Sequence, residues 1–179
     1  METNLYTVTV PVMQKTLTAL DKMLDKVAAH TETLANERRP ASYYENAILQ
    51  SRLVFDQFPL VQQVQVACDN AKNGAARLAE VEAPKMEDNE TTIAELKSRI
   101  AKTLEFLKTI KQADIDGKED IRVTLPYWGG KYLTGFEYAT EYLMPNFFFH
   151  YTTAYSILRS NGIQIGKSDY SGGLPLKDL

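Results

Sequence analysis

Residue types that commonly do chemistry are scarce in this chain, which holds two histidines and one cysteine. One histidine, His150, lies in the run PNFFFHYTTAYSILRSNG, and apolar residues share its helical face at steps of three or four: Leu143, Phe147, Ala154 and Ile157. An imidazole aimed into a core is a metal ligand, a general base in a pocket, or a buried histidine satisfied by hydrogen bonds. The third interpretation is preferred, because no nucleophile partner for His150 can be identified.

Donors that could share a metal ion with His150 are few and weak. Asn146 stands four residues earlier on the same face, and Asp69 lies on the helix that opens near Pro59. A glutamine of that helix could supply a further oxygen, the choices being Gln62, Gln63 and Gln65. A stable site usually needs three or four good donors. The metal candidates are therefore His150, Asn146 and Asp69, and a buried, hydrogen-bonded histidine is the simpler interpretation.

The other histidine, His30, falls near the end of the first helical pattern, where the helix dipole favours a cation. We expect it to cap that helix end, although it could also lie at the mouth of a cavity that contains His150. The candidate pocket residues are thus His30, Gln65, Asp69, Asn146 and His150. No phosphate loop or nucleophile elbow is found, so no catalytic residue is assigned.

Composition limits the classes of function. The 179 residues carry a net charge of −3, 44% are hydrophobic and 24% are charged, which is typical of one soluble domain spanning residues 1–179. A chain without a basic face is not expected to bind nucleic acid, and no apolar run is long enough to span a membrane. Cys68 lies among small apolar residues and is expected to be buried, and a lone cysteine without a secretory signal fits the cytoplasm.

Hydrophobic periodicity predicts four long helices. The first follows Met13, Leu17, Leu20, Leu24 and Val27 and fades after His30. A short helix over 43–49, with a capping box of Ser42 and Glu45, precedes the second long helix, which runs from Pro59 toward Pro84 with a face of small residues. Small residues let another helix approach closely.

The third and fourth helices begin at recognisable capping boxes, Thr92 with Glu95 and Thr134 with Glu137. Between these helices, apolar and polar residues alternate and a glycine pair could form a tight turn, so a β-hairpin is expected over 121–134. Pro145 should kink or restart the fourth helix, which closes at Gly162, and residues 163–179 are expected to be a loop-like tail. Short antiparallel connections would join the helices into a bundle.

Three runs, RLVFDQFPLVQQVQVACDNAK, ARLAEVEAP and PNFFFHYTTAYSILRSNGIQIGKSDY, resemble a bacterial domain-of-unknown-function family of the DinB/YfiT-like superfamily. The resemblance implies an all-α, up-down four-helix bundle with a small β-hairpin inserted before the last helix. Superfamily members that hold a metal carry one histidine on the second helix and two on the fourth, four residues apart. Here His150 matches the last of these histidines, and Leu158, Arg159 and Gly162 match the residues after it, whereas Asn146 stands at the preceding position and the second helix has no histidine.

The functional expectation is a small-molecule ligand bound in a bundle cavity around His150, without an assigned activity. The alternative is a metal-dependent hydrolase or transferase of the DinB-like type with a degenerate divalent-metal site. A third hypothesis is an interaction protein that meets a partner through its aromatic surface. Phe148 and Phe149 point away from the His150 face, and exposed aromatic side chains often mark interfaces, so a homodimer is expected.

Overall fold

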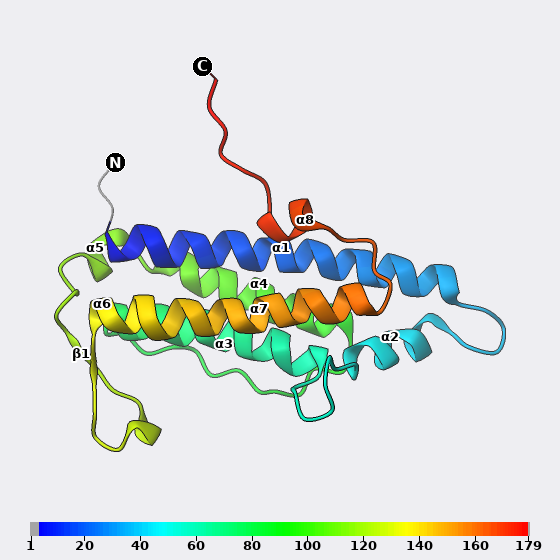
Figure 1. Cartoon of the computed structure of the whole chain (residues 1–179), viewed down its shortest axis with the longest axis horizontal. Helices are drawn as coiled ribbons and strands as arrows, with labels where there is room; N and C mark the ends of the chain where they lie inside the picture. The colour runs from blue at the N-terminus through cyan, green and yellow to red at the C-terminus, as the bar shows by residue number, and fades with distance from the viewer. Residues whose placement is uncertain (1–3, 179) are drawn as a thin grey trace.

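Four long helices pack side by side along one axis in the computed structural model, which describes residues 4–178 (Figure 1). They are α1 (Leu5–Leu34), α3 (Leu60–Ala79), α4 (Ile93–Thr109) and α7 (Met144–Ser160). A two-stranded sheet precedes the last of them. This arrangement confirms the expected all-α bundle with a small hairpin.

The core lies where the expected apolar stripes meet. Met13, Leu17, Leu20, Leu24 and Val27 of α1 are all fully buried. The small residues of α3 allow the close approach predicted for them, since a Cβ added at Gly74 would lie 2.2 Å from Leu143 Cδ1. Leu143 directly precedes α7, and the adjoining contact between α3 and α7 is the most extensive in the bundle. This contact positions His150.

The connection between α3 and α4 differs from the short antiparallel link expected there. Figure 1 shows residues 80–92 returning along the bundle, so that α3 and α4 run in the same direction. At its start, α4 is held to α2 (Ala41–Leu49), because Glu45 accepts a hydrogen bond from the backbone N–H of Ile93. At the first residue of the returning segment, an ion pair joins Glu80 to Lys118, which follows α5 (Gln112–Ile115). Residues 80–92 are called the crossover below.

Helix capping agrees with the sequence at two of three places. Thr92 and Glu95 cap α4 reciprocally, and Thr134 and Glu137 do the same for α6 (Gly135–Glu137), as predicted. The predicted capping box at the start of α2 is wrong: the N-cap residue is Pro40, which makes no side-chain cap. The carboxylate of Glu45 is used on α4 instead, a long-range contact that local spacing cannot reveal.

The hairpin region connects α5 to the last helix. Strand β1 (Arg122–Val123) pairs antiparallel with β2 (Leu133–Thr134), as expected. Between them come a short 3₁₀ turn, η1 (Pro126–Trp128), and Gly129 and Gly130 with φ of 60° and 80°. Such positive φ values favour glycine. The loop projects from one end of the bundle (Figure 1).

The chain stays helical through the region of Pro145. A π-helical turn, η2 (Tyr138–Leu143), leads directly into α7, with right-handed helical backbone angles at Glu137, Leu143 and Met144, and this wider turn comes just before Pro145, which has no N–H to donate. Gly162 follows with a φ of 83°, as expected for a glycine that closes a helix. The glycine closure is confirmed, whereas at Pro145, where a kink or a restart was expected, the helix continues through a π-helical turn.

The tail is more ordered than the predicted loop, because residues 167–171 form the short helix α8 (Lys167–Ser171). Lys26 of α1 pairs with Asp169 at 2.7 Å, and Tyr151 Oη donates to the carbonyl oxygen of Tyr170 at 2.6 Å. These contacts hold α8 against the bundle, and the residues after it point away from it (Figure 1). Within residues 4–178, no helix combines the length and the apolar character that crossing a bilayer requires.

Candidate functional site

His150 lies on the inner face of α7, with 8% of its surface exposed. Its Nδ1 is 2.7 Å from Oε1 of Gln63, a fully buried side chain of α3. The Gln63 amide is itself held, because its Nε2 donates to the carbonyl oxygen of Phe58 at 3.0 Å. Phe58, Gln63 and His150 are thus linked by two consecutive hydrogen bonds. This geometry supports the interpretation of His150 as a buried, hydrogen-bonded histidine.

The direction of these bonds locates the proton on the imidazole. Since the amide nitrogen of Gln63 is committed to the Phe58 carbonyl, its oxygen faces His150 and can only accept, so Nδ1 carries the hydrogen. Burial lowers the pKa of His150 and keeps the ring neutral. The remaining nitrogen, Nε2, therefore presents a lone pair.

Nε2 of His150 retains contact with solvent. Within residues 4–178, Nε2 has no hydrogen-bond partner. The fully buried side-chain atoms that lack a partner in this range are Gln57 Oε1, Asn70 Nδ2 and Arg99 Nε, and Nε2 of His150 is not one of them. An acceptor that is accessible but unpartnered inside an otherwise buried side chain is the group a ligand can reach. This atom is the chemical centre of the candidate site.

Two half-exposed aromatic rings flank the imidazole. Phe58 stacks on it with a centroid separation of 6.5 Å and an interplanar angle of 18°, and Phe149 meets it edge-on at 5.1 Å and 90°. Their exposed fractions are 48% and 53%. Phe58 also lines an open depression of about 450 Å³ between residues 50–59, the first turns of α3 and the crossover. The two phenylalanine rings make the immediate surroundings of the imidazole apolar, whereas the neighbouring depression also carries charged side chains, Arg52, Asp88 and Glu90.

The two asparagines one turn away, Asn146 on α7 and Asn70 on α3, face each other. Asn146 Nδ2 lies 3.4 Å from Asn70 Oδ1, at the long end for a hydrogen bond. Asn70 Nδ2 is buried without a partner in the described part of the chain. The structure thus brings the predicted pair of Asn146 and His150 to the same α3–α7 contact, but the amide of Asn146 is engaged with another amide.

Asp69 and Gln65 belong to a different cluster, around Arg99 of α4. The Arg99 side chain is 1% exposed and contacts three carboxylates, Asp69 at 2.8 Å, Asp88 at 2.8 Å and Glu90 at 3.0 Å. Gln65 Nε2 donates to Glu90 at 2.8 Å. Both residues are thus committed to polar partners other than His150.

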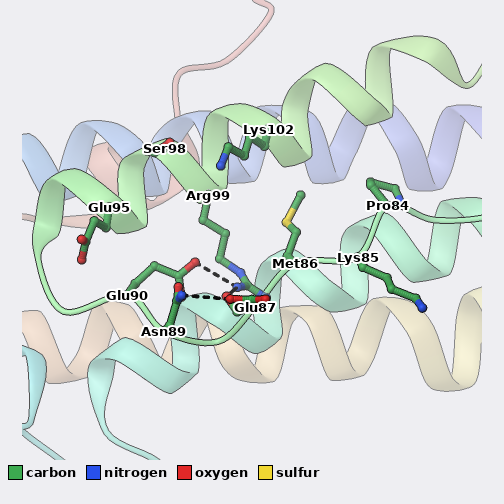
Figure 2. A pocket seen from close by; sticks show the side chains of 10 residues that line it. All are labelled: Pro84, Lys85, Met86, Glu87, Asn89, Glu90, Glu95, Ser98, Arg99 and Lys102. Atoms are coloured by element: carbon green, nitrogen blue, oxygen red, sulfur yellow. Dashed lines mark hydrogen bonds and ion pairs between the residues drawn. The ribbon is translucent and has the colours of Figure 1, made fainter.

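The Arg99 cluster fastens the crossover to the bundle. Figure 2 shows Arg99 extending from α4 toward the crossover, with the Glu90 side chain directed at it. Both residues line a groove of about 480 Å³. Arg99 also donates to the carbonyl oxygen of Glu87 at 3.0 Å. Burial alone would raise the pKa of Glu90, but hydrogen bonds from Gln65 and Arg99 outweigh it and lower this pKa. The cluster is a structural clamp.

His30 lies in the last turns of α1, and its carbonyl oxygen accepts a hydrogen bond from Thr33 Oγ1 at 2.7 Å. Among residues 4–178 its ring makes no hydrogen bond or ion pair with the other candidates. The five candidates therefore fall into three groups: His150 with Asn146 at the α3–α7 contact, Asp69 with Gln65 in the Arg99 cluster, and His30 by itself. The residues that complete the His150 site are Gln63, one of three possible glutamines, Phe58, which the sequence did not single out, and Phe149. The expectation that Phe149 points away from His150 is wrong, because its ring meets the imidazole edge-on.

The residues present do not fit the metal ion that the fold family implies. Gln63 uses its oxygen to accept from His150, Asn146 is paired with Asn70, and Asp69 is paired with Arg99. In the part of the chain from residue 4 to residue 178, no group of three or more His, Cys, Asp or Glu side chains is arranged to hold a metal. Asn146 bonds to Asn70 through its nitrogen, so His150 would have at most the neutral Asn146 oxygen beside it, fewer than the three or four good donors of a stable site.

Comparison with known proteins identifies the family. The family described as Domain of unknown function (DUF1993) matches residues 5–171. This chain belongs to it. The DUF1993 chain is also similar to a solved structure, the crystal structure at 1.83 Å resolution of a DinB family member protein from Shewanella denitrificans, with 45% identity and a TM-score of 0.90. The similarity covers 98% of this chain and 96% of that one. Comparison with curated proteins gave no match.

Proposed function

We propose that this DUF1993 protein binds a small molecule at His150, with the apolar part of the molecule against Phe58 and Phe149 and a polar group on Nε2. The observation that carries the proposal is the 2.7 Å contact between Gln63 and His150 Nδ1, which directs the free lone pair to the accessible edge of the ring. Ligand sites are commonly apolar with a few fixed polar groups. Phe58 also lines the depression described above, which His150 and Phe149 do not line, so a ligand on the imidazole would reach that depression only across the Phe58 ring.

Phenol is a suitable probe because its ring can pack on the two phenylalanines while its hydroxyl donates to Nε2. Backbone amide shifts of the ¹⁵N-labelled chain would be followed as phenol is added. The expected shifts lie at residues 58, 149 and 150, and they should be lost in His150→Leu but retained in the control His30→Leu. Shifts that persist in a folded His150→Leu variant would place the ligand elsewhere and refute the proposal.

We also propose that the chain forms a homodimer through residues 53–55. Leu53, Val54 and Phe55 are exposed apolar side chains, and Phe55 is 93% exposed. Exposed Arg52 and Asp56 flank these apolar side chains, and their opposite charges are complementary between two copies related by a two-fold axis. Sedimentation should show a dimer at micromolar concentration for the wild type and a monomer for Phe55→Ser. A monomeric wild type would rule out this dimer.

A further inference from the structure

We infer that Gln63 is a specificity-determining residue of the His150 site and that it selects neutral hydrogen-bond donors over carboxylates. This inference rests on the proposed function, since it names the class of ligand that the site takes. Gln63 does not touch the ligand. It acts by fixing which nitrogen of the imidazole carries the proton.

The position of the proton on His150 depends on two hydrogen bonds in series. The Phe58 carbonyl oxygen can only accept, so the amide of Gln63 must turn its NH₂ toward it, at 3.0 Å. This leaves Oε1 toward His150 at 2.7 Å, and that oxygen requires a donor, Nδ1–H. Gln63 is fully buried, so water does not compete for either bond. The tautomer of His150 is thus set by a backbone carbonyl two hydrogen bonds away.

The consequence for a ligand comes from the lone pair at Nε2. A hydroxyl or an N–H group can donate to it, whereas a carboxylate would place its own lone pairs against that of the ring. Binding a carboxylate would require a second proton on the imidazole, and burial between Phe58 and Phe149 opposes the charged form. A site that leaves a buried polar group unpaired rejects the wrong ligand more strongly than a purely apolar one does.

The experiment uses the full chain labelled with ¹⁵N-histidine, and long-range ¹⁵N–¹H spectra that distinguish protonated from unprotonated ring nitrogens. A His30→Gln variant assigns the two histidines. The wild type should show Nδ1 of His150 protonated and Nε2 unprotonated. Phenol and benzoate, which share a ring and differ in the polar group, are then titrated separately. Phenol should bind about tenfold more tightly, as expected for one hydrogen bond gained.

Gln63→Met removes both hydrogen bonds at nearly constant volume, and Gln112→Met, at an exposed glutamine of α5, is the matched control. Gln63→Met should yield a mixture of tautomers and reduce the preference for phenol to about twofold or less, whereas Gln112→Met should change neither. Should Gln63→Met fail to fold, the wild-type spectrum and the two wild-type affinities decide the question.

Each outcome has a separate meaning. A wild-type His150 protonated at Nε2 would overturn the inference whichever probe binds, and so would equal or tighter binding of benzoate. Binding of neither probe, with Nδ1 protonated, would refute the proposed small-molecule function and leave the positioning of His150 by Gln63 standing. Loss of the preference in Gln63→Met alone would establish the inference.

Discussion

Arg99 of α4 donates to Asp69 of α3 at 2.8 Å, and this contact joins two helices that run in the same direction. Parallel neighbours in a bundle require a connection that returns along its length, and here that connection is the crossover. Arg99 also contacts the crossover at Glu87, Asp88 and Glu90. One buried guanidinium therefore holds both the pair of helices and the segment that connects them.

Replacing Arg99 should destabilise the protein strongly. Arg99→Met leaves Glu90 without its cation and leaves Asp69 with Lys72 alone, at 3.2 Å. Removing one partner from a buried charged cluster typically costs about 3 to 5 kcal/mol. Because Asp88 is well exposed and Asp69 partly so, we expect a loss of about 2 to 4 kcal/mol in the free energy of unfolding, measured by urea denaturation.

The matched control is Lys102→Met, one turn further along α4 and exposed, which should change the free energy of unfolding by less than about 0.5 kcal/mol. Hydrogen exchange should also become faster across residues 80–92 in Arg99→Met alone. Equal stability of the two variants would show that the Arg99 cluster does not hold the crossover.

The sequence predicted local structure better than contacts between distant segments. Thr92 with Glu95 and Thr134 with Glu137 each satisfy backbone donors three residues apart, so the pattern alone is sufficient. Glu45 has the same spacing from Ser42 but caps Ile93, far along the chain. Nothing in the local pattern distinguishes these cases, because the choice depends on where α2 and α4 meet.

The candidate site was predictable only in part, for the same reason. Helical spacing places His150 and Asn146 on one face, and the structure confirms that both meet α3. Spacing could not choose among the glutamines of α3, since the rotation of that helix against α7 decides that Gln63 faces His150. It also could not assign Asp69 to Arg99, because that pairing depends on the parallel direction of α3 and α4.

The stability of the protein should depend on the protonation of His150. Burial lowers the pKa of this residue in the folded state, while the unfolded chain titrates near about 6.5. Between these two values the unfolded state binds more protons, so the free energy of unfolding falls as pH is lowered below about 6.5. Above that value, His150 makes no pH-dependent contribution.

Urea denaturation between about pH 7 and pH 5.5 measures the effect, because most carboxylates titrate below this window. His150→Leu should flatten the dependence, and His30→Leu should leave it in place. A pH dependence that survives in His150→Leu would assign the titration to another group.

Cys68 should be inert toward alkylation in the folded protein. Burial raises the pKa of its thiol to about 12, so that at pH 8 the thiolate fraction is on the order of one in ten thousand. Iodoacetamide should therefore modify the native chain very slowly and the urea-unfolded chain rapidly, as measured by mass spectrometry. Rapid labelling without denaturant would mean that α3 opens locally around Cys68.

Gly135 should tolerate no side chain, in contrast to Gly166. A Cβ added at Gly135 would lie 2.0 Å from the backbone carbonyl oxygen of Lys118, whereas at Gly166 it would meet nothing within 4 Å. Backbone atoms cannot move aside as a flexible side chain can, so Gly135→Ala should lower the free energy of unfolding by about 1 to 3 kcal/mol. Both positions have φ values that alanine can adopt, so strain in the glycine backbone does not explain the difference.

Gly166→Ala should be neutral or stabilising by up to about 1 kcal/mol, because alanine restricts the unfolded chain. At Gly135, the first residue of α6, alanine also has the higher helix propensity, which acts against the expected loss. A measured loss therefore reports the clash with Lys118 rather than a change in propensity. If thermal denaturation showed Gly135→Ala as stable as Gly166→Ala, then residue 118 would not pack against the start of α6 in solution, and the hairpin would be less firmly joined to the helix that carries His150.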